Sequence, residues 1–129
     1  MVRSRSIAIL SIVATIGVGG VATASTPPAS RTVNAPTASN QTVRLHVGDK
    51  LRVHLPTSFR RPTSSQPNVL KRISSWGGYP TTDDAHATFQ ALAVGRSDVS
   101  SETDYACLHA TPRCEIAQQV WVVHVIVTP

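Results

Sequence analysis

Residues 42–55 read TVRLHVGDKLRVHL, and their pattern is the strongest indication of the fold. Apolar residues occupy every second position on both sides of a Gly48-Asp49-Lys50 turn: Val43, Leu45 and Val47 before it, and Leu51, Val53 and Leu55 after it. The residues between them are arginine or histidine. A period of two is typical of a strand with one buried face, so the pattern predicts two such strands.

Four further segments are compatible with strands, and clusters of glycine, proline, serine and aspartate separate them: residues 69–73, 86–92, 98–106 and 119–127. The last segment has apolar residues on both faces, which predicts a central strand. No segment of helical length shows a clear 3.6-residue period. The sequence therefore predicts an all-β fold, an antiparallel immunoglobulin-like β-sandwich of six to seven strands.

The N-terminus has the pattern of a secretory signal peptide over residues 1–24. Arg3 and Arg5 precede an apolar segment at residues 7–21, and Ala22-Thr23-Ala24 supplies the small residues that signal peptidase cleaves after. The alternative is an uncleaved anchor, but an apolar segment of roughly 15 residues is shorter than the ~20 needed to span a bilayer. We expect cleavage, with a secreted, extracytoplasmic chain that has no membrane span left.

Residues 25–41 are rich in proline, serine, threonine and alanine and contain almost nothing apolar. Such a segment cannot bury enough surface to offset the entropy lost on ordering, so we expect a disordered leader. The β-sandwich domain is then residues 42–129, which is long enough for one domain and too short for two.

Charge excludes one class of partner. The chain has 12 Lys and Arg against 7 Asp and Glu, a net charge of +5 to which the signal segment contributes Arg3 and Arg5. No run of basic residues alternates with aromatic ones, so we expect no nucleic-acid partner.

Cys107 and Cys114 are the two cysteines, and an even count in an exported chain predicts a disulfide rather than paired free thiols. The bond would close a small loop and stabilise the fold by roughly 2 to 3 kcal/mol in the chain-entropy model.

Evidence for catalysis or metal binding is weak, and we expect no catalytic residue, no metal and no cofactor. His46, His54 and His124 lie at outward strand positions. A Cys-x-His pair at Cys107 and His109 is also found in blue-copper sites, but those sites need a free thiolate. There is no Gly-x-Ser-x-Gly motif either.

The remaining possibility of an enzyme depends on Asp83, Asp84 and His86, which cluster at a predicted turn and could hold a metal or orient a nucleophile. Their spacing matches no established ligand pattern, so turn chemistry explains the aspartates better. An active site there would show a pocket with perturbed His or Asp titration.

Three predicted loops carry the candidate binding residues. Large aromatic side chains in loops provide binding energy at little entropic cost, and residues 74–80 place Trp76 and Tyr79 around two glycines. The alternative for Trp76 is a lid folded back on the core. The other loops are residues 56–67 and the disulfide loop. The candidates are Phe59, Arg60, Arg61, Trp76, Gly77, Gly78, Tyr79, Leu108 and His109.

Several short segments resemble the chagasin-type cysteine-protease inhibitors, immunoglobulin-like domains with secreted bacterial relatives. These segments are VGDKLRVHLP at residues 47–56, the pair Gly77-Gly78, TFQALAVG at residues 88–95, Tyr105, and WVVHV at residues 121–125. The resemblance spans residues 43–127 and implies a sandwich that inhibits proteases through three clustered loops.

The inhibitory motifs of that family are mostly absent. The family's first loop reads Asn-Pro-Thr-Thr-Gly, whereas residues 56–61 read PTSFRR; its third loop carries Arg-Pro-Trp, whereas residues 106–109 read ACLH. Only the glycine pair of the middle loop carries over, so the resemblance supports the fold better than it supports inhibition.

The predicted function is therefore that of a secreted, non-catalytic binding module of uncharacterised partner, structural or ligand-binding at the cell envelope. The alternative is a chagasin-like protease inhibitor that acts through three clustered loops. The partner would be a protein, such as a protease, or a cell-envelope component.

Overall fold

The computed structural model describes residues 19–20 and 30–129. The predicted signal peptide, apart from Gly19 and Gly20, and the first part of the predicted leader lie outside the described residues. In the described part, no helix is long and apolar enough to cross a membrane.

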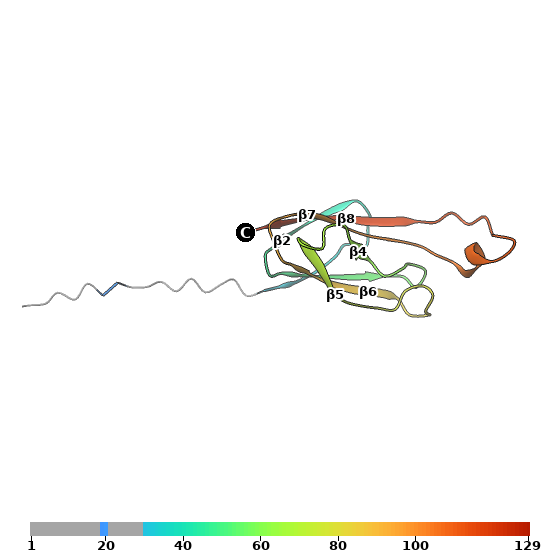
Figure 1. The fold of residues 1–129 in the computed structure, drawn as a ribbon, viewed down its shortest axis with the longest axis horizontal. Helices are drawn as coiled ribbons and strands as arrows, with labels where there is room; N and C mark the ends of the chain where they lie inside the picture. The colour runs from blue at the N-terminus through green and yellow to red at the C-terminus, as the bar shows by residue number, and fades with distance from the viewer. Residues whose placement is uncertain (1–18, 21–29) are drawn as a thin grey trace, which may run out of the picture.

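The described chain forms two four-stranded sheets that pack face to face (Figure 1). In sheet order, the first consists of β1 (Thr32–Asn34), β3 (Lys50–Leu55), β6 (Ala85–Ala91) and β5 (Leu70–Trp76). The second consists of β2 (Gln41–His46), β8 (Val120–Thr128), β7 (Gly95–Glu102) and β4 (Thr63–Ser64). A short 3-10 turn, η1 (Ala106–His109), lies between β7 and β8. This arrangement confirms the predicted all-β, immunoglobulin-like sandwich.

Two details differ from the prediction. The described chain has eight strands rather than six or seven, and β1–β3 and β2–β8 pair in parallel, so both sheets are mixed rather than antiparallel. The two strands of residues 42–55 also belong to different sheets, because the Gly48-Asp49 turn carries the chain from one layer to the other. Alternation predicts which face of a strand is buried, but it does not specify the neighbouring strand.

The predicted disordered leader, residues 25–41, contains a strand in the structure. Thr32–Asn34 pair with the first residues of β3, and Val33 and Ala35 pack against the core. Arg31 Nε donates to Asp49 Oδ2 at 3.1 Å, and the Asp49 side chain is almost fully buried. The folded part therefore begins no later than Arg31. A polar segment can add a strand because the pairing uses backbone groups, which every residue except proline supplies.

The core lies between the sheets and consists of inward residues from both. The fully buried ones include Leu51, Val53, Leu70, Phe89, Val99 and Val123. β8 lies between β2 and β7, which confirms the predicted central position of the last strand.

Candidate functional site

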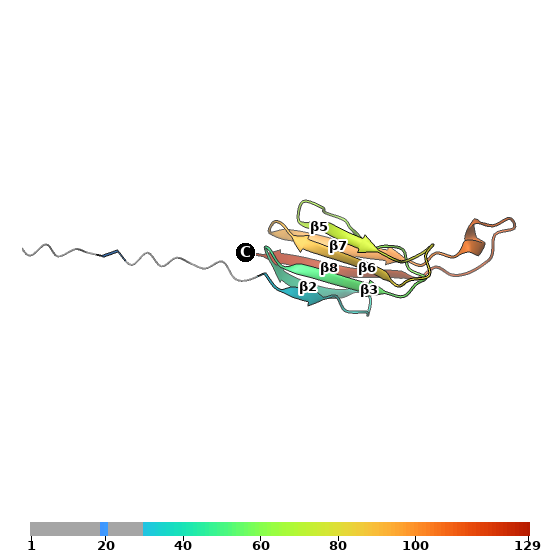
Figure 2. The same cartoon turned by 90° about the horizontal axis from the view of Figure 1, so that it is seen from below.

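Three connections meet at the end of the sandwich opposite to the C-terminus. They are loop 1 (residues 56–62, after β3), loop 2 (residues 77–84, between β5 and β6) and loop 3 (residues 103–119, between β7 and β8). We call this end the loop edge. Loop 3, drawn in orange and red, projects well beyond the sheets (Figures 1 and 2).

Main-chain hydrogen bonds join the three loops. The Tyr79 amide of loop 2 donates to the Phe59 carbonyl of loop 1 at 2.8 Å. The Asp104 amide of loop 3 donates to the Ser58 carbonyl at 2.8 Å. Loop 1 thus lies between the other two and ties both to itself, so the edge is one structural unit.

Gly77 and Gly78 allow the backbone of loop 2 to pack closely on itself and against loop 1. Both have positive φ, at 70° and 72°, and both are buried. A Cβ on Gly77 would lie 1.9 Å from the Asp84 carbonyl oxygen, and one on Gly78 would lie 2.7 Å from that of Phe59. The glycine pair therefore has a packing role, whatever else it does.

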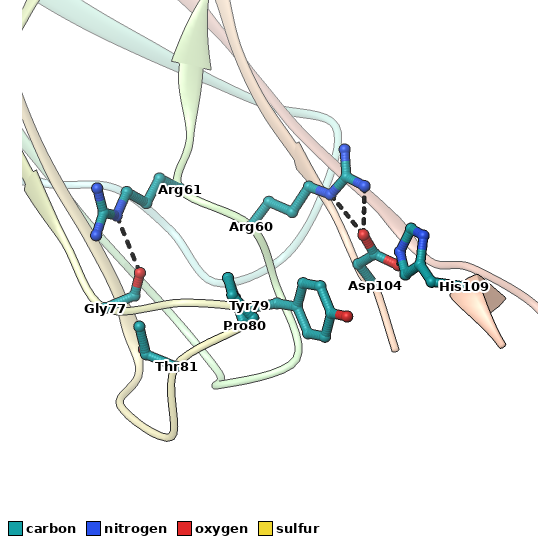
Figure 3. Close-up of a pocket in the computed structure, with 8 residues that line it drawn as sticks. All are labelled: Arg60, Arg61, Gly77, Tyr79, Pro80, Thr81, Asp104 and His109. Atoms are coloured by element: carbon teal, nitrogen blue, oxygen red, sulfur yellow. Dashed lines mark hydrogen bonds and ion pairs between the residues drawn. The ribbon is translucent and has the colours of Figure 1, made fainter. Parts of the chain in front are cut away.

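Asp104 links loop 1 to loop 3 through its side chain, which is 2% exposed. It accepts hydrogen bonds from the Arg60 guanidinium and, at 2.8 Å, from His109 Nε2 (Figure 3). The hydrogen bonds from Arg60 hold the pKa of Asp104 below its usual value, although burial opposes this; His109 and the Tyr105 amide add to the lowering. A buried carboxylate with these donors stays charged and rigid.

An open groove of about 580 Å³ lies between the loops. Tyr79 and His109 face each other across it, with ring centroids 6.1 Å apart, and Arg61 Nε donates to the Gly77 carbonyl at 3.1 Å (Figure 3). The lining residues are Arg60, Arg61, Gly77, Tyr79, Pro80, Thr81, Asp104 and His109. Five of the nine candidate binding residues thus come together at one groove.

The other candidates lie elsewhere. Phe59 and Leu108 are each only 9% exposed, and Phe59 belongs to the core, so both offer little surface to a partner. Gly78 is buried as described above. Trp76 is the last residue of β5, not part of a loop, and it is 54% exposed, so the alternative of a lid on the core is wrong.

Cys107 and Cys114 form the predicted disulfide within loop 3. The Cys114 amide also donates to the Cys107 carbonyl at 3.1 Å. The bond therefore closes a short ring at the projecting end of loop 3, as expected from the spacing.

Three residues that line the groove were not among the predicted candidates: Asp104, Pro80 and Thr81. Asp104 falls within the segment predicted as a strand over residues 98–106, whereas β7 ends at Glu102. A lone aspartate next to a predicted strand carries no signal for its distant partner Arg60. Pro80 directly follows Tyr79 and could have been included on proximity alone.

The acidic cluster of Asp83, Asp84 and His86 does not form one site. Asp84 Oδ2 lies 2.7 Å from His54 Nε2, while His86 stacks between Trp76 and His54. Over residues 30–129, no group of three or more histidines, cysteines or carboxylates is placed to hold a metal ion.

No protein-family model matches the sequence, and no curated protein matches it. Among solved structures, the fold is similar to the cysteine protease inhibitor EhICP2 from Entamoeba histolytica, with a TM-score of 0.58 and 8% identity over 79% of this chain and 100% of that one. Amebosin and PbICP-C, the latter in complex with falcipain-2, each align with a TM-score of 0.45 over 77% of this chain, at 10% and 13% identity and over 98% and 100% of their own lengths. At these identities the likeness concerns the fold. The fold-level resemblance to the chagasin-type inhibitors is confirmed.

Proposed function

We propose that this chain is a non-catalytic inhibitor of papain-type cysteine proteases, which inserts the loop edge into the active-site cleft. The observation that carries the proposal is the joining of three loops, from three different strand connections, into one edge by main-chain hydrogen bonds. Such an edge is ordered before it meets a partner, so binding costs little conformational entropy.

The surface chemistry of the edge supports this role. The residues at the tip of loop 2, from Pro80 to Asp83, are exposed, and they are flanked by exposed Arg61 and His109. Tyr79 supplies a partly exposed ring beside them. A tyrosine with a neighbouring arginine is typical of the anchors that dominate binding energy at protein interfaces. The similarity of fold to EhICP2, a cysteine protease inhibitor, also supports the proposal.

The disulfide supports an extracytoplasmic location, since such bonds persist in oxidising compartments. We therefore propose that the partner protease is met outside the cytoplasm. The family's own inhibitory motifs are not required for this proposal, because rigidity and shape can be supplied by other residues.

The test is inhibition of papain by the purified, oxidised chain, with trypsin as a protease of another class. We expect inhibition of papain at micromolar concentration or below, and none of trypsin. Thr82→Arg places a bulky side chain at the exposed tip of loop 2 and should weaken inhibition at least tenfold. Ala93→Arg is the matched control, because Ala93 is exposed in the turn between β6 and β7 at the opposite end.

The control variant should inhibit within twofold of the unaltered chain. Failure to inhibit papain or related proteases would refute the proposal. Equal weakening by both substitutions would show that another surface binds the protease.

A further inference from the structure

The outer face of the sheet β1-β3-β6-β5 carries a second, separate arrangement of side chains. Inward residues of β3 and β6 are buried, so the residues between them point outward: Lys50, Arg52 and His54 on β3, and His86, Thr88 and Gln90 on β6. The register places Lys71, Ser74 and Trp76 of β5 beside the β6 residues. We call these nine residues the cationic face.

The strand register arranges the cationic face in three rows. Lys50 and Lys71 flank Gln90 in one row, and Arg52 and Ser74 flank Thr88 in the next. His54 and Trp76 flank His86 in the third row, nearest the loop edge. Figure 2 shows β3, β6 and β5 side by side in this layer.

The third row is a stack of three rings. The centroids of Trp76 and His86 are 3.9 Å apart with planes at 13°, and those of His86 and His54 are 4.4 Å apart with planes at 11°. The facing ring surfaces cover one another, so a ligand above the sheet meets ring edges. Ring edges carry the positive part of the aromatic quadrupole and the N–H groups of tryptophan and histidine, which favour an anion.

The first two rows add cations without counter-charges. Over residues 30–129, Lys50, Arg52 and Lys71 form no salt bridge with a carboxylate. Asp84 at the rim is engaged by His54. The face is therefore electrostatically complementary to a negatively charged ligand.

Two hollows flank the Arg52 side chain. One, of about 370 Å³, lies between Arg52, Trp76 and His86, with Ser74 and Thr88 also lining it. The other, of about 340 Å³, lies between Arg52, His54 and His86 and reaches Asn34 and Thr37 beside β1. Each hollow thus combines a guanidinium, ring edges and neutral hydrogen-bonding groups.

We propose that the cationic face binds an acidic polysaccharide. Arg52 takes a carboxylate or sulfate group between its guanidinium and the ring edges, since this planar donor suits both oxyanions. Lys50 and Lys71 meet further charges along the polymer, and Ser74, Thr88 and Gln90 bond to sugar hydroxyls. Single-stranded nucleic acid fits less well, because its bases stack on open ring faces, and the stack covers both faces of His86 and one face each of Trp76 and His54.

This site lies on a sheet face, apart from the groove of the loop edge, and touches loop 2 through the His54–Asp84 pair. A chain that holds an extracytoplasmic polymer on one face and presents three loops at its end would act as an inhibitor anchored in the surrounding matrix.

The first test measures binding of the unaltered chain to polygalacturonate, which carries carboxylates, and to dextran sulfate, at an ionic strength of about 0.15 M. Neutral dextran and single-stranded poly(dT) are the comparison polymers. We expect binding to one or both acidic polysaccharides and at least tenfold weaker binding to the other two. Failure to bind either acidic polymer, or equal binding of neutral dextran, would refute the proposal. Tighter binding of poly(dT) would replace it with a nucleic-acid site.

The second test locates the site with matched double variants. Arg52→Gln with Lys71→Gln should weaken binding at least tenfold. Arg44→Gln with Arg96→Gln removes two exposed arginines from the outer face of the opposite sheet, where both flank Ile126, and should leave the affinity within twofold. Equal loss in the two variants would show non-specific charge attraction and overturn the assignment.

The third test measures tryptophan fluorescence of the unaltered chain and needs no substitution. Trp121 is buried at 3% exposure, so acrylamide quenching of tryptophan fluorescence reports mainly on Trp76. Bound polysaccharide should protect Trp76 from acrylamide, and unchanged quenching at saturation would contradict binding at this face. Inhibition of papain should be unaffected by Arg52→Gln with Lys71→Gln, which separates this proposal from that of the loop edge.

Discussion

At the scale of single residues, Gly77 and Asp104 determine how the loops meet. The Asp84 carbonyl leaves no space for a side chain at Gly77. The Asp104 carboxylate accepts hydrogen bonds from Arg60 and His109. The glycine pair was recognisable in the sequence, because it lies in a predicted loop and matches the glycine pair in the middle loop of the chagasin-type inhibitors. The partners of Asp104 were not, since they come from positions brought together only by folding.

Gly77→Ala should destabilise the fold by about 3 kcal/mol or more, because it combines a strained positive φ with a clash against backbone. Gly48→Ala is the matched control: Gly48 has a φ of 95° but nothing within 4 Å of the added Cβ, so the cost should be about 1 kcal/mol. Urea unfolding of both variants measures the difference. Equal losses would show that the close approach to Asp84 contributes nothing.

At the scale of elements, β1 extends the first sheet beyond what composition suggests. It pairs with β3 in parallel over three residues, and the Arg31–Asp49 ion pair holds its start. The segment contains little that distinguishes it from a flexible leader, because the only strongly apolar residue of β1 is Val33. Strands predicted from alternation, by contrast, all appear in the structure with shifted ends.

A chain that begins at Gln41 should be less stable than one that begins at Ser30, by about 2 kcal/mol. The shorter chain loses the burial of Val33 and Ala35 and leaves the buried Asp49 without its Arg31 partners. Thermal or urea unfolding of the two chains provides the comparison. Equal stability would mean that β1 is a marginal addition to the sheet.

At the scale of the whole molecule, two buried carboxylates lie at opposite ends of the sandwich. Burial alone would raise the pKa of Asp49, but the amides of His46 and Arg31 and the Arg31 guanidinium outweigh it, so the pKa of Asp49 is lowered. The pKa of Asp104 is lowered by Arg60 first, as described above. Each of the two carboxylates thus contributes to stability in its charged form.

The free energy of unfolding should therefore be highest above the ordinary pKa of aspartate, about 3.9, and fall as pH decreases through the lower folded-state values. The sign follows from proton uptake: below pH 4 the unfolded chain binds protons that the folded chain does not. Asp104→Asn should flatten this dependence, and adding Asp49→Asn should flatten it further. Urea unfolding between about pH 2 and pH 7 measures the slopes, and an unchanged slope in both variants would contradict the assignment.

The class of fold, the buried faces of most strands and the disulfide could all be predicted from the amino-acid sequence. These features depend on local patterns: alternation specifies a buried face, and two cysteines seven positions apart can close a ring. The pairing of the strands, the position of Trp76 on a sheet face instead of in the loop edge, and the meeting of Arg60, Asp104 and His109 became visible only in the folded chain. The physical reason is that pairing and register arise from packing between distant segments, which no local period records.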